Sequence, residues 1–264
     1  MTMDQNDAIP VFYCFARSGG TLLNQCLGIT EGNLVLSEVN PHISCRSIEQ
    51  QAHEWLGLLT SDERVVFSRL PYAQKIRQLH DRARSQKTQL ILRDWCTVNF
   101  LARTAADETE PSGVLEQPFY LSTVGLTPRA LVFTRRASAV YASIRENFPQ
   151  LHKLDLNEFA EAYLEYARAV ADLPIFKLED FTVNPTEVMA AIAERLGVPV
   201  AKDFKKRYRN FQHCTGNNLI WPPPRSLKAE SINPRVEKQR QSDSLANAQH
   251  PKLGEADSIF GYAS

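Results

Sequence analysis

Short apolar runs alternate with amphipathic stretches along most of the chain. The apolar runs are rich in β-branched and aromatic residues, and they predict strands near 10–16, 33–37, 88–93, 129–135 and 174–178. The stretches between them have helical spacing. In 156–171 the apolar residues form one stripe, which indicates a helix packed on a core. This alternation predicts an α/β fold of three layers, in which helices flank both faces of a mainly parallel sheet.

Other segments carry helix signals of a different kind. Asn184 can cap a helix whose first residue is Pro185, and Gly197 is suited to end it. The segment 46–86 is helical and rich in charges of both signs, which predicts a solvent-facing helical insertion between the second and third strands. An insertion at this position could form one wall of a substrate pocket.

The composition changes after Trp221. Lys, Gln, Ser, Asn and Pro then predominate and large apolar residues become rare, as in segments that cannot bury a core. We therefore expect a single domain over 1–220, followed by an extended or mobile arm over 221–264. The apolar residues within 259–262 could dock this arm on the domain or on a second copy of the chain, which leaves a homodimer open.

The overall composition is that of a globular protein without marked charge. The chain has 264 residues, of which 43% are hydrophobic, and its 30 basic and 30 acidic residues give a formal net charge of zero. A domain of this size buries roughly three quarters of its unfolded surface. The zero net charge argues against attraction to nucleic acid. No stretch is apolar enough to span a membrane, and the polar start lacks the features of a signal peptide, so we expect a cytoplasmic protein.

Five cysteines are scattered along the sequence without CxxC spacing, at Cys14, Cys26, Cys45, Cys96 and Cys214. An odd number without paired spacing indicates neither a disulfide framework nor a zinc site. We expect their side chains to pack as small hydrophobic groups.

A short turn follows the first predicted strand. Its sequence is Arg-Ser-Gly-Gly-Thr over 17–21, and a predicted helix follows directly. Glycines let the backbone approach an anion closely, and the N–H groups of the helix start, at about Thr21 and Leu22, point toward it with the positive end of the helix dipole. The pattern predicts a site for a nucleotide phosphate. The turn lacks the lysine of the usual nucleoside-triphosphate loop, and its cation is Arg17.

A second phosphate-binding pattern lies at the end of the fourth predicted strand. Arg135 ends the strand, a helix begins near Ala137, and Ser143 follows Arg135 eight positions later. If the helix folds back beside the strand end, the guanidinium and the hydroxyl can grip one phosphate from two sides. The two patterns together predict two phosphate pockets.

This pair of patterns resembles the 5′-phosphosulfate loop and the 3′-phosphate site of the sulfotransferases that use 3′-phosphoadenosine-5′-phosphosulfate (PAPS). The loop of that family reads roughly [K/R]-S-G-[ST]-T, and an arginine followed eight positions later by a serine forms its second site. The segment 175–185 is similar to a third family element, the "KYEDL…NP" strand and helix entry. The resemblance covers about 10–220.

The resemblance implies a fold and a reaction. The fold is the P-loop NTPase-like sulfotransferase fold. The reaction transfers a sulfuryl group from PAPS to a hydroxyl or amine of a small-molecule or glycan acceptor and leaves 3′-phosphoadenosine-5′-phosphate (PAP). An enzyme of this kind must stabilise charge on the leaving phosphate oxygen and deprotonate the acceptor, and no metal is expected.

The resemblance also assigns residues to the two pockets. Arg17 stands at the position of the family's loop lysine and would stabilise the leaving phosphate, while Ser18 and Thr21 would ligate 5′-phosphate and sulfate oxygens. Arg135 and Ser143 would bind the 3′-phosphate. This chain lacks the Arg-Lys-Gly triplet that closes over the nucleotide in the family, and residues 215–217 are expected to replace it. The expected donor-binding residues are Arg17, Ser18, Gly19, Gly20, Thr21, Leu22, Arg135, Ser143, Thr215, Gly216 and Asn217.

The resemblance leaves the general base open. Cytosolic members carry a histidine at the end of the third strand, where this chain has Asp94, and other branches use a glutamate. Two acids qualify, Glu38 and Asp94, each at the end of a predicted strand. Glu38 is favoured, because its Ser-Glu pair resembles an element of bacterial members. A structural role for Glu38 as the partner of Arg17 or Arg93 stays open, as does a surface or structural role for His42.

Two other functions remain open from the residues. In a small-molecule or nucleotide kinase, Asp94 would belong to the acidic strand that holds a metal, although the missing loop lysine speaks against it. A non-catalytic nucleotide-binding protein would keep the phosphate patterns on the same fold and lack a working base.

Overall fold

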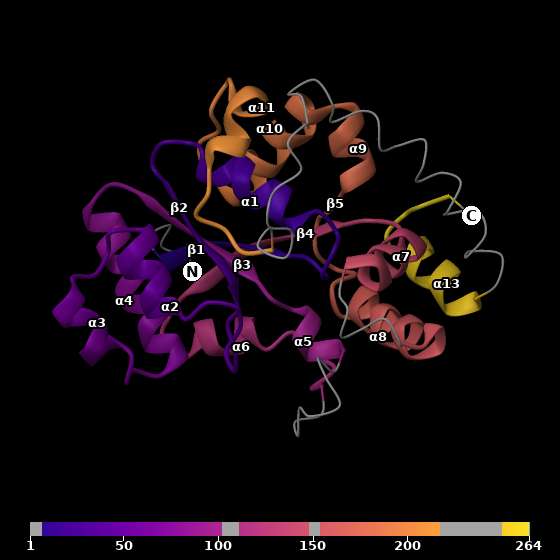
Figure 1. The fold of residues 1–264 in the computed structure, drawn as a ribbon, viewed down its shortest axis with the longest axis horizontal. Coiled ribbons are helices and arrows are strands. Elements are labelled where there is room, and N and C mark those ends of the chain that lie inside the picture. The colour runs from indigo at the N-terminus through magenta and orange to yellow at the C-terminus, as the bar shows by residue number, and fades with distance from the viewer. Residues whose placement is uncertain (1–6, 102–110, 148–153, 217–249, 264) are drawn as a thin grey trace, which may run out of the picture.

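A five-stranded sheet forms the centre of the computed structural model, which describes residues 7–101, 111–147, 154–216 and 250–263 (Figure 1). The strands span Ala8–Tyr13 (β1), Asn33–Val39 (β2), Gln89–Asp94 (β3), Thr127–Thr134 (β4) and Ile175–Lys177 (β5). Their order is β2-β3-β1-β4-β5, and every pairing between them is parallel. The five predicted strands are confirmed, with bounds that shift by a few residues. The carboxyl ends of β3, β1 and β4 lie side by side, at the edge where parallel sheets bind ligands.

Helices cover both faces of the sheet, which confirms the three-layer α/β architecture. One face carries α1 (Gly20–Gly28), α9 (Leu178–Val183), α10 (Pro185–Leu196), α11 (Phe204–Arg207) and the 3₁₀ turn η4 (Tyr208–Asn210). The other carries α4 (Tyr72–Ser85), α5 (Thr97–Phe100), α6 (Gln117–Ser122), α7 (Ala137–Asn147), α8 (Leu156–Ala169) and α13 (Pro251–Ile259). Successive residues of a strand point to opposite faces. Phe12 therefore joins one core, and Val11 and Tyr13 join the other.

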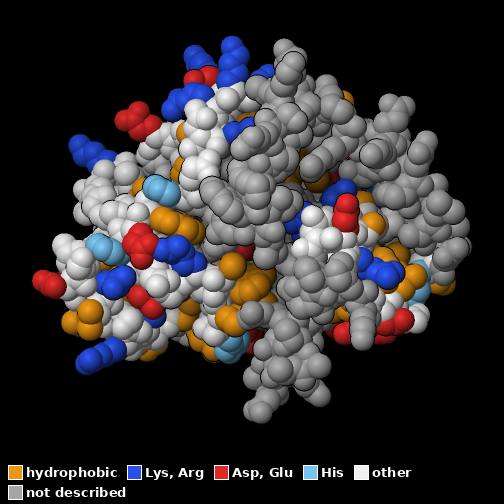
Figure 2. Space-filling view, viewed as in Figure 1, with side chains coloured by type: hydrophobic (Ala, Val, Ile, Leu, Met, Phe, Trp, Pro, Cys, Tyr) orange, Lys and Arg blue, Asp and Glu red, His pale blue; other side chains and the backbone are white. Residues whose placement is uncertain are grey.

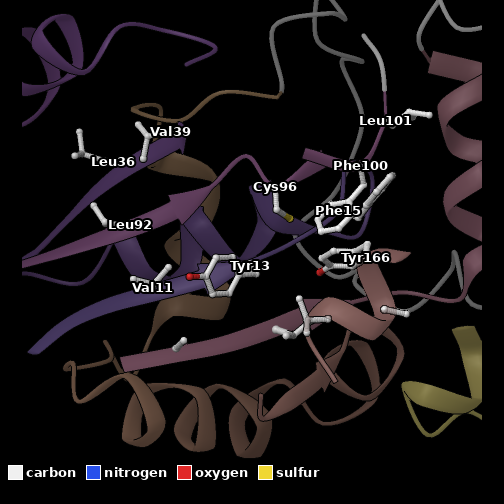
Figure 3. Packing of buried hydrophobic residues seen from close by; sticks show 14 of the residues in the cluster. Val11, Tyr13, Phe15, Leu36, Val39, Leu92, Cys96, Phe100, Leu101 and Tyr166 are labelled. Atoms are coloured by element: carbon white, nitrogen blue, oxygen red, sulfur yellow. The ribbon is translucent and has the colours of Figure 1, made fainter. Parts of the chain in front are cut away.

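An aromatic cluster anchors the chain where it leaves β1. The ring of Phe15 packs edge-on against Tyr163, with 5.1 Å between centroids, and at a tilt against Tyr166 at 5.3 Å. All three side chains are buried. Figure 3 shows the rings of Phe15 and Tyr166 next to one another in the core that also contains Tyr13. Such aromatic pairs contribute about 0.5–1.5 kcal/mol each beyond area burial, so the loop that follows starts from a fixed point.

The segment 46–86 is helical as predicted, but one of its helices belongs to the core. It contains α2 (Ile48–Gln50), the π-helical turn η2 (Gln51–Trp55), α3 (Ser61–Phe67) and α4. In α4, Ile76, Leu79 and Ala83 are fully buried, because they recur at helical spacing on the side that packs on the sheet. The expectation of solvent-facing helices is therefore wrong for α4, which lies on the crossover between the parallel neighbours β2 and β3.

The C-terminal residues differ from the extended or mobile arm expected over 221–264. Of this segment the structure describes 250–263, where the chain forms α13 and packs on α7 and α8. Leu253, Ala256 and Phe260 are at most 2% exposed, because their spacing places them on one side of the helix. Residues 217–249 lie outside the described residues, and the domain boundary at 220 stays a prediction.

The predicted helix bounds hold elsewhere. Asp155 caps α8 and accepts hydrogen bonds from the backbone of residues 157 and 158. Pro185 is the first residue of α10, and Gly197 ends it in a left-handed conformation with a φ of 68°.

The cysteines are mostly buried, as expected for side chains that pack as small hydrophobic groups. Four of the five cysteines are buried, whereas Cys45 is exposed, and all five are free thiols.

Figure 2 shows Lys and Arg side chains gathered at the top of the molecule over α11, where Lys205, Lys206 and Arg207 are exposed. Within the described ranges no helix is long and apolar enough to cross a membrane.

Candidate functional site

The loop between β1 and α1 has the geometry of an anion-binding turn. Ser18 N donates to Phe15 O at 3.1 Å, and Ala16 N donates to the Thr97 hydroxyl at 2.7 Å. Gly19 is the N-cap of α1 and has a left-handed backbone, with a φ of 91°. No described side chain caps the first N–H groups of this helix. Such N–H groups are available to an anion, and the helix dipole favours negative charge there.

The backbone of this loop is closely packed. A Cβ atom on Gly20 would lie 2.3 Å from Cys14 Sγ, and one on Gly19 would lie 2.9 Å from Leu178 Cδ1. Neither distance can be accommodated without movement, and Gly19 also needs its left-handed φ. The path of the loop therefore depends on both glycines.

The two phosphate-binding patterns meet in the structure. Arg17 donates from Nε to Ser143 Oγ at 3.0 Å, and Arg135 donates from Nη1 to Arg17 O at 3.5 Å. Asn147, one turn after Ser143 on α7, donates from Nδ2 to Ser143 O at 2.8 Å. Two guanidinium groups and a hydroxyl thus lie together beside the carboxyl ends of the neighbouring strands β1 and β4.

Thr215 joins the end of the third described segment, 154–216, to the loop. Its carbonyl accepts from Thr21 Oγ1 at 3.1 Å, and its N–H donates to Ser37 Oγ at 3.1 Å. The hydroxyls of Thr215 and Ser37 are 2.8 Å apart. A Cβ on Gly216 would lie 2.4 Å from Thr21 Oγ1, so the backbone passes close to the start of α1. Asn217 lies outside the described residues.

Glu38 forms a buried ion pair with Arg93. Arg93 donates from Nη2 to Glu38 Oε1 at 2.6 Å, and the two side chains are 5% and 13% exposed. Burial lowers the pKa of Arg93, but the charge of Glu38 and the Cys14 thiol outweigh it, so the pKa lies above its usual value. Glu38 lies where the β2–β3 register shifts, and its φ of 51° is left-handed. Irregularities of this kind aim a side chain in a new direction.

Asp94 lies on the opposite face of the sheet from Arg93. Its neighbours there include Tyr13 and Tyr72, whose hydroxyl pKa values it raises after the larger effect of burial. Asp94 is 1% exposed, and burial, with a smaller contribution from Glu116, raises its pKa well above the ordinary value. Its Oδ1 has no hydrogen-bond partner among the described residues. The two acids predicted at strand ends therefore do not share one pocket, because adjacent residues of β3 point to opposite faces.

His42 belongs to a polar cluster at the carboxyl ends of β2 and β3. Its Nε2 lies 2.6 Å from Glu116 Oε2, and its side chain is 58% exposed. Glu116 also accepts from Asn99 Nδ2 at 3.0 Å, and Asn99 in turn accepts from Asn40 Nδ2 at 2.8 Å. A carboxylate in this position fixes the orientation of the histidine ring.

Four side chains of the site were not assigned to it from the sequence. They are Ser37, Arg93, Thr97 and Asn147. Arg93 was expected only as one open partner of Glu38, beside Arg17, and the ion pair places it at the site. The others are ordinary polar residues whose place depends on tertiary contacts.

The gathered donors suit the oxygens of an anionic ligand. The start of α1 and the Thr21 hydroxyl form one group. Arg135 and Ser143 form another, and Arg17 contacts both of them. Guanidinium groups, hydroxyls and helix N–H groups are the usual ligands of phosphate and sulfate oxygens. Across the part of the chain that the structure describes, no group of three or more His, Cys, Asp and Glu side chains is arranged to hold a metal ion.

Comparison with solved structures gives the same fold. The sulfotransferase domain from the Synechococcus PCC 7002 olefin synthase matches with a TM-score of 0.60 and 18% identity, over 97% of this chain and 95% of that one. The sulfotransferase domain from the curacin biosynthetic pathway matches with a TM-score of 0.57 and 14% identity, over 97% and 98% of the two chains. No protein-family model and no curated protein matches the sequence. The chain has the sulfotransferase fold.

Proposed function

We propose that this protein transfers a sulfuryl group from PAPS to a hydroxyl or amine of a small-molecule or glycan acceptor. The main support for this proposal is the hydrogen bond from Arg17 to Ser143. It joins the loop after β1 to the helix after β4, on a sulfotransferase fold. PAPS has a phosphosulfate at its 5′ end and a phosphate at its 3′ position. The two groups of donors in the site match these two ends.

The donor-binding roles follow from the position of each group. Ser18, Thr21 and the backbone of Gly19 to Leu22 hold the phosphosulfate at the start of α1. Arg135 and Ser143 hold the 3′-phosphate. Arg17, whose guanidinium contacts Ser143 and whose carbonyl contacts Arg135, links the two ends. Thr215 and Gly216 close one side of the loop through Thr21, and Asn217 is expected to continue this wall.

The transfer breaks one sulfur–oxygen bond and forms a bond from sulfur to the oxygen or nitrogen of the acceptor. The bond from sulfur to the 5′-phosphate oxygen breaks, a bond from the acceptor atom to sulfur forms, and the acceptor proton passes to a base. Negative charge grows on the departing phosphate oxygen. Arg17 and the N–H groups at the start of α1 stabilise that charge, and their fixed orientation makes the stabilisation effective.

Glu38 is the proposed base. It lies on the loop side of the sheet, where its Oε1 would be 3.6 Å from a Cβ on Gly216. Among the described residues other than glycine, only Arg17, Glu38 and Lys87 have a left-handed φ. Unusual backbone conformations gather at functional sites, and two of these three residues are the proposed catalytic pair. Arg93 holds one carboxylate oxygen of Glu38.

Two other groups could take the acceptor proton. Asp94 is buried on the opposite face, and its raised pKa favours the neutral carboxyl, which disfavours both a base role and the metal-holding role of the kinase alternative. His42, oriented by Glu116, is exposed and belongs to the same edge of the sheet. His42 is therefore the stronger rival of Glu38.

Thermal unfolding with nucleotides tests the donor. PAP should raise the melting temperature more than AMP, ADP or ATP do, and it should do so without magnesium, because a ligand that binds the folded state alone stabilises it. An equal or larger shift with ATP and magnesium would contradict the proposal and favour the kinase.

Turnover tests the reaction. Incubation with sulfur-labelled PAPS and a panel of phenols, alcohols, amines and glycans should transfer label to at least one acceptor class and release an equal amount of PAP. PAP binding without label transfer to any acceptor class would favour the non-catalytic nucleotide-binding protein.

A further inference from the structure

The turn between β4 and α7 is held by side chains from other elements. Tyr163 of α8 donates from its hydroxyl to Arg135 O at 2.7 Å. Glu179 of α9 accepts from Arg136 N at 3.2 Å. Both contacts fix backbone groups, so they fix the direction in which the Arg135 side chain leaves the turn.

Asp257 of α13 holds the next residue of this turn. Its Oδ1 accepts from Ala137 N at 2.9 Å, and its Oδ2 lies 3.9 Å from Arg136 Nη1. Asp257 is 4% exposed, so solvent screens these interactions little. A carboxylate at a helix start also interacts favourably with the helix dipole. Asp257 thus occupies the N-terminus of α7, and α7 presents Ser143 to the site from its second turn.

Tyr262 adds another contact from the same end of the chain. Its hydroxyl donates to Glu179 Oε2 at 2.7 Å, while Glu179 Oε1 holds Arg136 N. The ring of Tyr262 lies 4.8 Å from the Arg136 guanidinium carbon and 4.6 Å from Lys177 Nζ, at cation–π distance. Lys177 Nζ also donates to Gly261 O at 2.6 Å.

The two adjacent arginines therefore have different partners. Arg135 contacts the carbonyl of Arg17 in the proposed donor site. Arg136 faces Asp257 and Tyr262. The same short turn thus joins the donor site on one side to the C-terminal helix on the other.

We infer that α13 positions the 3′-phosphate site, with Asp257 and Tyr262 as positioning residues that act through the backbone of residues 135–137. The inference rests on the proposed function, because it takes Arg135 as a ligand of the 3′-phosphate. Loss of Asp257 releases Ala137 N and Arg136, and the Arg135 guanidinium loses its fixed direction. The affinity that is lost is then confined to ligands that carry a 3′-phosphate.

The test compares PAP with AMP, which lacks the 3′-phosphate. Calorimetric titration of the full chain gives the ratio of the AMP and PAP dissociation constants, and this ratio reports the 3′-phosphate contribution. Asp257→Ala should lower the ratio roughly tenfold, since a charge-assisted contact is weakened. Asp257→Asn, which keeps an acceptor for Ala137 N, and Tyr262→Phe, which keeps the ring, should each lower it less. Glu255→Ala is the matched control, because Glu255 lies on the same helix in an exposed pair with Arg168, and it should leave the ratio unchanged.

A measurement without nucleotide separates this inference from the proposed function. Amide hydrogen exchange at residues 136–140 should be faster in Asp257→Ala and Tyr262→Phe than in the wild type and in Glu255→Ala. A wild-type AMP-to-PAP ratio in every Asp257 and Tyr262 variant would overturn the inference while the wild type still binds PAP. If Asp257→Ala does not fold, Asp257→Asn and Tyr262→Phe decide the question. A wild-type protein that does not bind PAP would instead overturn the proposed function, and the exchange rates would still test whether α13 holds the turn.

Discussion

Arg17 and Ser143 are 126 positions apart in the sequence and are joined by a hydrogen bond of 3.0 Å from Nε to Oγ. The backbone of Arg17 is left-handed, with a φ of 67°. For residues other than glycine this conformation costs roughly 1–2 kcal/mol. The strain is maintained by the surrounding packing and directs the guanidinium from the loop toward α7. Arg17 thereby contacts both residues of the proposed 3′-phosphate site, Ser143 through its guanidinium and Arg135 through its carbonyl.

Removal of the Arg17 guanidinium should cripple turnover. We expect Arg17→Ala to lower kcat by roughly 10²-fold or more, with PAP binding weakened less, because the charge acts mainly on the departing phosphate oxygen. Arg17→Gly is the matched control, since glycine adopts the left-handed backbone without strain. Steady-state kinetics should give the same loss for both variants. A large recovery in Arg17→Gly would mean that the backbone, not the charge, limits the reaction.

Arg135→Ala should weaken PAP binding selectively. The loss of a charge-assisted phosphate contact is worth on the order of 2 kcal/mol. Binding of adenosine 5′-phosphosulfate, which lacks the 3′-phosphate, should change little. Calorimetric titration of both ligands checks this expectation, and an equal loss for the two would assign Arg135 a structural role.

The parts of the molecule that were predictable depend on local sequence. The apolar runs fixed the five strands, and Pro185 and Gly197 marked both ends of α10 correctly, because these signals act within a few residues. The loop and the strand end at Arg135 were recognisable for the same reason.

The unpredicted parts depend on contacts between distant segments. Asp257 holds the N-terminus of α7 from the far end of the chain, and Glu116 reaches His42 across several elements. The pair Arg93 and Asp94 illustrates a different limit. Both residues are ionisable, adjacent and buried, but the pleat directs Arg93 to Glu38 and Asp94 to the opposite face of the sheet. The register of β3 against its neighbours decides which face of the sheet each of these two side chains occupies.

Glu38→Gln tests the proposed base. The amide keeps the shape of the side chain but cannot accept the acceptor proton, so kcat should fall by about 10²-fold or more while PAP binds normally. Once an acceptor is known, kinetics of Asp94→Asn and His42→Gln provide the comparison. Near-normal turnover in Glu38→Gln together with a large loss in His42→Gln would transfer the role to the histidine held by Glu116.

A methyl group at Gly20 should disturb the loop chiefly through Cys14, since its next neighbour, Arg93 Nε, would lie farther away at 3.0 Å. The new Cβ would lie 2.3 Å from Cys14 Sγ, so Gly20→Ala should reduce the free energy of unfolding by about 1–3 kcal/mol. Cys14→Ala removes that sulfur, and the double variant should recover much of the loss, which chemical denaturation can measure as a coupling energy. Gly254→Ala is the control. It has open space around it within α13 and should stabilise the protein by about 0.5–1 kcal/mol. Simple additivity of the two loop substitutions would show that the contact with Cys14 is not the cause.

Asp94 should make the folded protein less stable as the pH rises. Burial raises the pKa of Asp94 well above its ordinary value, so between that value and the raised one the folded state binds more protons than the unfolded state. The free energy of unfolding then falls with increasing pH in this window, by at most about 1.4 kcal/mol per pH unit for one group. Asp94→Asn has no such proton to lose. Its stability relative to the wild type should therefore increase from pH 5 to pH 8, as measured by chemical denaturation at each pH. Parallel stability profiles for the two proteins would mean that Asp94 keeps the same protonation state on folding throughout that range.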